Sequence, residues 1–170
     1  MVSIQFKITH TYNKKYSDYL GELIMKIAIA ADHAGFEYKS KIIEWLKESG
    51  NNPIDFGTND SDSCAYPDYA YPAAEAVANH SAYYGIIICG SGIGMSIVAN
   101  KVPGIRAANC MTPEMARLAR QHNNANVLTL GARLINFEIA KEIISTFLNT
   151  EFEGGRHTKR VEKIHLLTGC

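Results

Sequence analysis

The fold is decided by the stretch Tyr84-Gly85-Ile86-Ile87-Ile88-Cys89-Gly90-Ser91-Gly92-Ile93-Gly94. Its three consecutive isoleucines predict a strand that is buried on both faces of a parallel sheet. The glycines at alternate positions after Cys89 let the main chain turn closely around a ligand before a helix that begins at Met95. The strand would therefore deliver a thiol to the amino end of a helix, where free N–H groups favour a thiolate, an oxyanion or a phosphate.

Two common nucleotide-binding motifs do not fit this stretch. A dinucleotide fingerprint needs G-x-G-x-x-G, but the third glycine comes one position early, as Gly94, and the next predicted strand ends in Asn109-Cys110 instead of an acidic residue. The phosphate-loop pattern G-x-x-x-x-G-K-[ST] does not occur in the chain. The structural alternative for Cys89 is a small buried hydrophobic residue, which is what free cysteine usually is.

Strand and helix patterns alternate on both sides of this stretch. Strands are predicted at residues 26–31, 52–57, 84–89, 105–110 and 126–130. Helices are predicted at residues 36–50, 70–79, 95–101 and 137–148, and another begins at Pro113 with Thr112 as its N-cap. This order predicts an α/β fold: a doubly wound, five-stranded parallel sheet in a Rossmann-like three-layer sandwich, followed by a C-terminal helix.

Composition narrows the class of protein. The chain has 170 residues with 17 basic and 17 acidic side chains, so its formal net charge is zero and nothing indicates attraction to nucleic acid or to a membrane surface. No apolar run approaches the ~20 residues that a membrane helix needs. The four cysteines contain no C-x-x-C pair, which is typical of free thiols in a reducing compartment, so we expect a cytoplasmic protein.

The N-terminal segment, residues 1–24, differs from the rest of the chain. Val2, Ile4, Phe6 and Ile8 alternate with polar residues as in a short strand, and a second methionine, Met25, directly precedes the first strong strand. We expect a leader or extension outside the fold, with residues 25–170 forming the domain. The alternative is an added edge strand or an organelle-targeting segment, although the segment lacks arginine.

Polar residues follow several of the predicted strands. In a parallel sheet, ligands bind beyond the carboxyl ends of the strands, near the point where the strand order reverses. Asp32-His33 follows the first strand and could divide proton transfer and anion contact between a carboxylate and an imidazole, although Asp32 could equally cap the next helix. The other groups at strand ends are Cys89-Gly90-Ser91, Asn109-Cys110 and Gly131-Ala132-Arg133.

Two further groups lie near helix ends. His122 stands where the fourth helix passes into the fifth strand, and the alternative to a catalytic role is a favourable interaction with the helix dipole. Arg156 and Arg160 lie one helical turn apart on one face, so their guanidinium groups suit a phosphate. The alternative is a solvated basic face that pairs with nearby glutamates.

Together these motifs make the chain resemble, from residue 25 to about residue 164, the ribose-5-phosphate isomerases of type B, in the family shared with bacterial galactose-6-phosphate isomerase subunits. The matching segments are Ala31-Asp32-His33-Ala34-Gly35-Phe36, Tyr66-Pro67-Asp68-Tyr69, Cys89-Gly90-Ser91-Gly92-Ile93-Gly94, Ala99-Asn100-Lys101, Arg120-Gln121-His122-Asn123, Gly131-Ala132-Arg133 and Glu153-Gly154-Gly155-Arg156-His157 with Arg160. Ala65 departs from the pattern, because many relatives carry an acidic residue there, and this affects only contacts around Tyr66.

The resemblance implies an aldose-ketose isomerase of carbohydrate metabolism, in the pentose phosphate pathway, that interconverts ribose 5-phosphate and ribulose 5-phosphate without a metal or organic cofactor. It implies that Cys89 is the base, that Ser91 moves protons between the two sugar oxygens, and that His122, with Asp32, opens the sugar ring. The implied sugar contacts are Asp32, His33, Tyr66, Gly90, Ser91, Gly92, Ile93, Gly94 and Asn123. The implied phosphate anchors are His33, Arg133, Arg156 and Arg160.

The resemblance also implies a homodimer, in some relatives a tetramer, whose active sites draw on both subunits, with His122 and Arg133 reaching the thiol of the partner chain. An isomerase of a six-carbon sugar phosphate, such as allose 6-phosphate or galactose 6-phosphate, remains an alternative. A third hypothesis, a non-catalytic doubly wound module that binds nucleotide or flavin, is disfavoured by the missing dinucleotide pattern.

Overall fold

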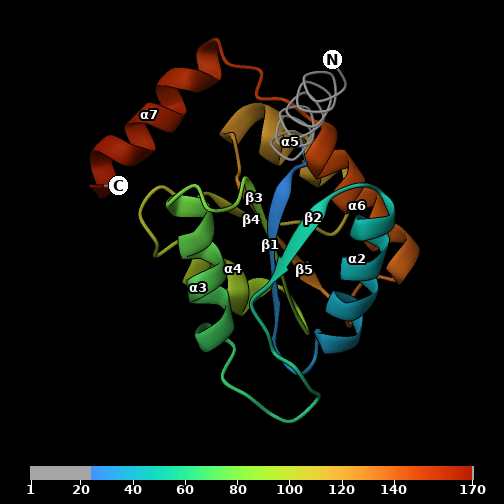
Figure 1. The fold of residues 1–170 in the computed structure, drawn as a ribbon. Helices are drawn as coiled ribbons and strands as arrows, with labels where there is room; N and C mark the ends of the chain where they lie inside the picture. The colour runs from blue at the N-terminus through green and yellow to red at the C-terminus, as the bar shows by residue number, and fades with distance from the viewer. Residues whose placement is uncertain (1–23, 170) are drawn as a thin grey trace, which may run out of the picture.

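The computed structural model describes residues 24–169, so the predictions for residues 1–23 lie outside the described part of the chain. The described elements alternate between strands and helices as the sequence indicates (Figure 1). The strands are β1 (Lys26–Ala31), β2 (Asn52–Asp55), β3 (Tyr84–Cys89), β4 (Ala107–Asn109) and β5 (Val127–Gly131). The helices are α2 (Phe36–Glu48), α3 (Pro67–Ala78), α4 (Ile93–Ala99), α5 (Pro113–Asn123), α6 (Phe137–Asn149) and α7 (Arg156–Thr168).

All strand pairs in the sheet are parallel, and the strand order is β2-β1-β3-β5-β4. From β1 the chain moves outward to β2 and then returns to the other side of β1 to form β3, so the strand order reverses between β1 and β3. The carboxyl ends of these two strands are therefore the expected place for a ligand. Asp32 and Cys89 lie at these two ends.

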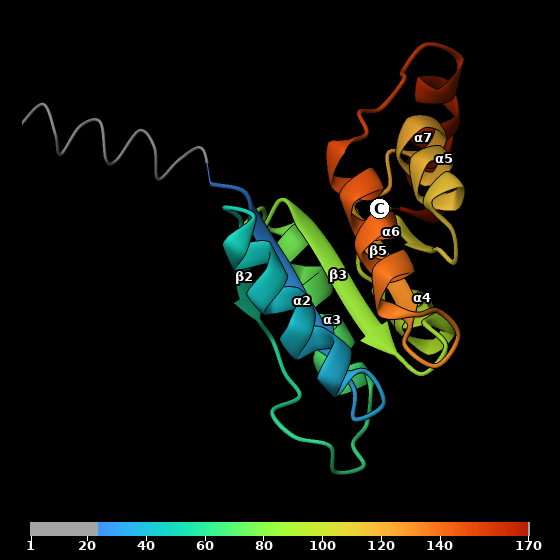
Figure 2. The same cartoon turned by 90° about the vertical axis from the view of Figure 1, so that its right-hand side faces the viewer.

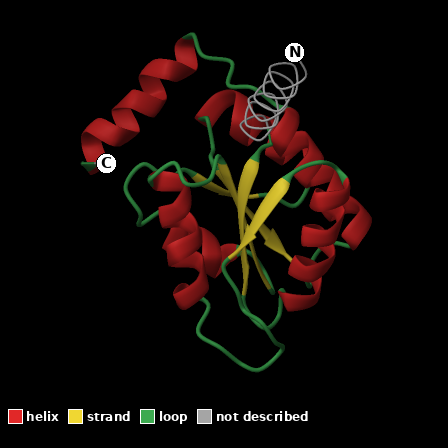
Figure 3. Ribbon diagram, viewed as in Figure 1, coloured by secondary structure: helices red, strands yellow, loops and turns green. Residues whose placement is uncertain are grey.

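Helices cover both faces of the sheet, which confirms the three-layer fold (Figures 2 and 3). Helices α2, α5 and α6 pack on one face against side chains such as Ile86, Ile88 and Leu128. Helices α3 and α4 pack on the other face, where Ile87, Cys89 and Met95 are buried. Because β3 is covered on both sides, its isoleucines are fully buried, as the sequence predicts.

The C-terminal helix α7 does not cover the sheet. It follows the loop after α6 and packs on α5, to one side of the three-layer body (Figure 1). Its buried side chains, His157 and Val161, mark the face that meets the body of the protein. The predicted C-terminal helix is thus confirmed, and its first turn carries Arg156 next to the C-terminal end of α5.

Several element boundaries differ from the sequence-based prediction by one to three residues. Helix α4 begins at Ile93 and ends at Ala99, earlier at both ends than predicted, because Gly92 adopts a left-handed conformation (φ 77°) that ends the turn directly before the helix. Strand β4 is shorter than predicted because it is an edge strand, paired on one side alone. Thr112 is the N-cap of α5, as predicted: its hydroxyl oxygen accepts a hydrogen bond from Met115 N. Within residues 24–169, we find no helix long and apolar enough to cross a membrane.

Candidate active site

Cys89 is the last residue of β3 and is held by the glycine loop that follows. Its side chain is 7% exposed, on the face covered by α3 and α4. The backbone N–H of Gly92 donates a hydrogen bond to Cys89 Sγ across 3.0 Å, and the left-handed conformation of Gly92 aims this N–H back toward the thiol. This hydrogen bond fixes the Cys89 sulfur beside the start of α4, at the carboxyl end of the strands, where ligands bind in a parallel sheet.

The loop cannot accept side chains at its glycines without moving. A Cβ on Gly92 would come within 2.9 Å of the backbone carbon of Leu130, and a Cβ on Gly94 would come within 2.9 Å of Tyr66 Cζ. Tyr66 therefore lies against the start of α4, with 39% of its surface exposed. That Tyr66 contacts the sugar stays a prediction.

Asp32 and His33 lie directly beside the end of β3. The backbone N–H of Asp32 donates to the carbonyl of Ile88 across 3.2 Å, which places Asp32 next to the residue that precedes Cys89. Asp32 Oδ1 accepts hydrogen bonds from Ala34 N (2.9 Å) and Gly35 N (3.1 Å), so this carboxylate also shapes the turn before α2. The structural alternative for Asp32 is therefore partly present, although the N-cap of α2 itself is Gly35.

The His33 imidazole has a defined orientation. Its Nδ1 accepts a hydrogen bond from the backbone N–H of Cys64 across 3.5 Å, which leaves the proton of the neutral ring on Nε2. Cys64 belongs to the loop that leads to Tyr66, so this contact ties the loop to the end of β1. The sequence did not assign Cys64 any role, because its contact with His33 spans 31 positions of the chain.

Arg133 joins this first group through the end of β5. The backbone N–H of Arg133 donates to the carbonyl of Gly90 across 3.1 Å, and a Cβ on Gly90 would lie 3.3 Å from Arg133 Cδ. The guanidinium group thus lies over the glycine loop of its own chain. Pairing of β5 with β3 sets Gly131 opposite Cys89, so Arg133 lies near the Cys89 of its own chain, and that it also reaches the thiol of a partner chain stays a prediction.

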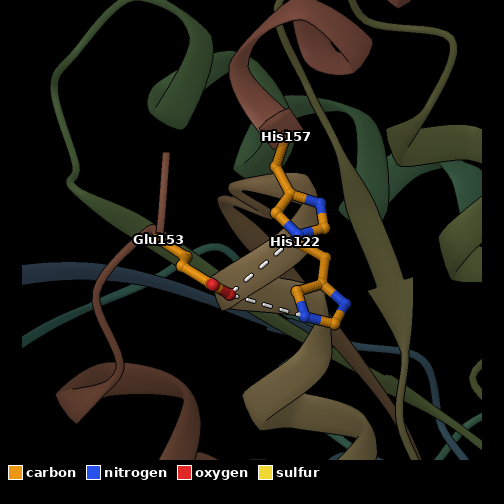
Figure 4. A group of neighbouring side chains, drawn as sticks. All are labelled: His122, Glu153 and His157. Carbon is orange, nitrogen blue, oxygen red and sulfur yellow. Dashed lines mark ion pairs between the residues drawn. The ribbon is translucent and has the colours of Figure 1, made fainter. Parts of the chain in front are cut away.

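A second group of residues, four of which are predicted site residues, gathers where α5 ends and α7 begins. His122 and His157 stack face to face, with ring centroids 4.3 Å apart and an angle of 3° between the planes. Glu153 Oε2 lies 3.7 Å from His122 Nε2 and 3.9 Å from His157 Nε2 (Figure 4). Burial, and then the nearby His122 and Arg156, lower the pKa of His157 from its usual value. The second group comprises His122, Asn123, Glu153, Arg156, His157 and Arg160.

In the described part of the chain, the two phosphate-binding candidates of this second group, Arg156 and Arg160, do not pair with glutamates, which was the structural alternative for them. Within residues 24–169, neither Arg156 nor Arg160 pairs with a carboxylate, and both are exposed. Arg156 Nε donates instead to His157 Nε2 across 3.2 Å. The two guanidinium groups therefore remain available to an anion.

The two histidines and Glu153 bring possible metal-ligand atoms within 4.8 Å of one another. A metal ion binds an imidazole in the plane of the ring, about 2.0–2.1 Å from the nitrogen. Two nearly parallel, stacked rings do not direct their lone pairs at one such point. The Nε2 atom of His157 also already accepts the hydrogen bond from Arg156. This arrangement suits proton handling and anion binding better than metal binding.

The two groups lie at opposite ends of the strands, the first at the carboxyl ends and the second at the amino ends. Cys89 ends β3, whereas Arg120, one turn before the end of α5, donates from Nη2 to the hydroxyl of Tyr84, the first residue of β3. Five residue steps of strand separate these ends, roughly 17 Å at about 3.3 Å per step. His122 and Cys89 therefore do not share one pocket within a single chain.

Three residues near His122 had no assigned role in the sequence-based prediction. Glu153 and His157 belong to a segment that matches the family, and this segment is the signal that could link them to His122. Arg120 belongs to a matching segment too, but the structure gives it a structural role. It is 6% exposed and donates to the carbonyls of Thr150 and Ala125 as well as to Tyr84.

Comparisons with known proteins identify the family of the chain. The model of the Ribose/Galactose Isomerase family matches residues 27–164. Ribose-5-phosphate isomerase B of Escherichia coli is 49% identical over 139 residues, which cover 82% of this chain and 93% of that protein. D-erythrulose-4-phosphate isomerase of Pectobacterium atrosepticum is 46% identical over 142 residues, covering 83% and 93%.

Solved structures give the same result. The structure of ribose-5-phosphate isomerase B from Clostridium thermocellum superposes with a TM-score of 0.84 at 49% sequence identity, and the match covers 85% of this chain and 98% of that one. The family match spans all five strands and the first turns of α7, and so includes both groups of site residues. The chain belongs to the ribose/galactose isomerase family.

Proposed function

We propose that the protein interconverts D-ribose 5-phosphate and D-ribulose 5-phosphate through an enediolate, with Cys89 as the base. The observation that carries this proposal is the thiol at the end of β3, with the N–H of Gly92 3.0 Å from its sulfur. Relatives that bear the name ribose-5-phosphate isomerase B support it, since the match extends over nearly their whole length.

The chemistry begins with a closed sugar ring. His122 donates a proton to the ring oxygen while Asp32 receives the proton of the C1 hydroxyl, the C1–O bond to the ring oxygen breaks, and an aldehyde forms at C1. Tyr66 and Asn123 contact the sugar. No metal or organic cofactor enters these steps.

Proton transfer between the carbons follows. Cys89 Sγ removes the proton from C2, and the electron pair moves to O1 as the enediolate forms. The N–H groups of the loop from Gly90 to Gly94 hold the developing negative charge on O1. Ser91 moves a proton from O2 to O1, and Cys89 returns its proton to C1, which completes the ketose.

The division of the site residues between the two ends of the sheet strands supports a homodimer with shared active sites. Asp32, His33, Tyr66, the glycine loop and Arg133 of one chain would meet His122, Asn123, Arg156 and Arg160 of a second copy. The phosphate would then lie between His33 and Arg133 from one side and the two α7 arginines from the other. A two-fold axis would generate two such sites, and dimers could pair further into a tetramer.

A mixing experiment tests the shared site. Chains with Cys89→Ala and chains with His122→Ala are each expected to be inactive on ribose 5-phosphate. If they are mixed under conditions that exchange subunits, half of the dimers are hybrids with one intact site in two, so about one quarter of the wild-type activity returns. Mixtures that stay inactive although hybrids form would exclude a site shared in this way.

The base is tested in the same protein. Cys89→Ala should lower kcat by at least the 10²–10⁴-fold that a positioned base contributes, while inorganic phosphate still binds. Cys110→Ala, which removes another buried thiol, is the matched control and should keep the wild-type rate. Near-normal turnover by Cys89→Ala in a coupled assay would remove Cys89 as the base.

Other sugar phosphates remain second candidates, because a relative of similar identity is named for D-erythrulose 4-phosphate. The same thiol, loop and arginines serve aldoses of four, five or six carbons, since pocket length and not the proton transfer distinguishes them. Comparison of kcat/KM for four-carbon, pentose and hexose phosphates under one set of conditions separates these candidates. We expect the pentose to have the highest value.

We further propose that residues 25–170 form the isomerase domain and that the protein works in the cytoplasm, in the pentose phosphate pathway. The family match, which begins at residue 27, supports the first point. A chain that begins at Met25 should then retain the kcat/KM of the full chain in the same assay.

A further inference from the structure

His157 lies between two residues of the proposed site, Arg156 and His122, which act on different parts of the substrate. On one side its Nε2 accepts the hydrogen bond from Arg156 Nε, at 3.2 Å. On the other side its ring stacks on His122, with the centroids 4.3 Å apart (Figure 4). His157 itself is 3% exposed, so it contacts both groups without a large surface of its own toward a ligand.

The contacts of His157 fix its tautomer and its charge. Arg156 is always protonated, so the nitrogen that accepts from it carries no proton, and the proton of the neutral ring lies on Nδ1. Glu153 Oε2 lies farther from His157 Nε2, at 3.9 Å, and so competes weakly with Arg156 for that nitrogen. Burial and the charges of His122, Arg156 and Arg160 all lower the pKa of His157, and only Glu153 opposes them.

The stacked ring of His157 fixes the orientation of its neighbour. The two imidazoles are parallel to within 3° with their centroids 4.3 Å apart, so the His157 ring covers one face of His122 and limits its rotation. Glu153 Oε2, 3.7 Å from His122 Nε2, lies beside the nitrogen of the same ring.

We propose that His157 is a positioning residue that links the phosphate anchor Arg156 to the ring-opening acid His122. Acceptance of the Arg156 N–H orients the guanidinium group, and the ring of His157, stacked face to face on His122, holds that imidazole in the orientation from which it protonates the sugar ring oxygen. This inference rests on the proposed function, and it adds a role that neither arginine nor His122 can supply alone.

Two variants separate the two contacts. In His157→Gln, the side-chain carbonyl can reach the place of Nε2 and accept from Arg156, but no ring stacks on His122. In His157→Phe, a ring still stacks on His122, but Arg156 loses its acceptor. His157 Nδ1 has no hydrogen-bond partner within residues 24–169, so His157→Phe leaves no new unpaired polar atom at Nδ1 and should fold.

The readout must distinguish ring opening from proton transfer at carbon. Ribulose 5-phosphate cannot close a five-membered ring, because its O5 carries the phosphate. Exchange of its C1 hydrogen with deuterium from heavy water therefore needs Cys89 and the phosphate anchors but not the ring-opening acid. Turnover of ribose 5-phosphate, which is a ring at rest, needs all of them.

For His157→Gln we expect kcat on ribose 5-phosphate to fall about 10- to 100-fold, part of what a general acid contributes, with KM and C1 exchange within about twofold of wild type. For His157→Phe we expect KM to rise about tenfold in both reactions, as for a lost hydrogen bond to a charged group, with kcat largely kept. The matched control is His165→Gln, which removes another arginine–histidine contact of α7, with Arg106, and should change neither reaction.

The outcomes separate this inference from the proposed function. If the wild-type protein neither turns over ribose 5-phosphate nor exchanges C1 of ribulose 5-phosphate, the proposed function fails. If the wild-type protein does both and the two variants match it, or if His157→Gln loses kcat in both reactions to the same degree at unchanged thermal stability, the link through His157 is refuted and the residue only fills space.

Discussion

Arg120 offers a quantitative test of how the C-terminal end of α5 is held. Its guanidinium group donates to the carbonyls of Thr150 (3.1 Å) and Ala125 (2.5 Å) and to the hydroxyl of Tyr84 (2.9 Å), and it lies 4.8 Å from the centroid of the Tyr84 ring. It thereby ties the end of α5 to the start of β3, of β5 and of the loop after α6. His122 lies two residues farther along, so this tie also sets its place.

The magnitude follows from what Arg120→Leu leaves behind. Two carbonyls lose a donor at a site where the arginine was 6% exposed, and each unsatisfied group costs about 1–3 kcal/mol. The contact with the Tyr84 ring adds about 0.5–2 kcal/mol. Burial of the leucine side chain returns about 1.5–3 kcal/mol, so at the midpoints of these ranges the net loss in free energy of unfolding is about 3 kcal/mol.

Urea denaturation followed by circular dichroism measures this loss, at one fixed protein concentration because an oligomer couples stability to concentration. The control is Arg117→Leu, three residues earlier on the same helix, where the arginine is 43% exposed and pairs with Glu114. That change should cost less than about 1 kcal/mol. A loss for Arg120→Leu no larger than for the control would refute the structural role.

Two further predictions concern the glycine loop and a buried thiol. In Gly94→Ala, the added Cβ would come within 2.9 Å of Tyr66 Cζ, so the exposed tyrosine ring moves aside. The KM for ribose 5-phosphate in steady-state kinetics should then rise about three- to tenfold, with little change in the midpoint of thermal unfolding. An unchanged KM would show that Tyr66 does not contact the sugar. Burial raises the pKa of Cys110 from 9.0 to about 11, so between these pH values the unfolded chain has lost a proton that the folded protein keeps. The stabilising contribution is complete below pH 9 and is lost as the pH rises toward 11, so wild type should lose more stability across this range than Cys110→Ala in urea titrations, and equal slopes would contradict the argument.

Most of the fold could be predicted because its signals are local. The isoleucines of β3, the cap at Thr112 and the turn at Gly92 each act within a few residues, and the structure confirms all three. The strand order could not be predicted beyond the fold class, because it depends on pairing between strands far apart in the sequence. The ion pair of the buried Lys39 with the exposed Asp55 could not be predicted for the same reason, since a lysine on a helix is expected at the surface until its partner is known.

The candidate site divides along the same line. The loop after Cys89 could be predicted in detail, because strand, thiol and glycines are consecutive in the sequence. The stack of His122 on His157 could not, because it joins the end of α5 to the first turn of α7 across 35 positions of chain. The resemblance supplied both segments, but only the packing of α7 on α5 shows that they form one group.

The separation of Cys89 from His122 follows from their positions relative to the strands. In a parallel sheet, a residue that follows a strand lies at the carboxyl ends of the strands, and a residue between a helix and the next strand lies at their amino ends. Cys89 ends β3, and His122 lies five positions before the start of β5, so no choice of side-chain rotamers brings them together. An isomerase that needs both residues in one site must therefore bring the carboxyl ends of the strands of one chain to the amino ends of the strands of another. In the proposed dimer, the exposed α7 arginines, which have no carboxylate partner within residues 24–169, would supply half of the phosphate site of the neighbouring copy.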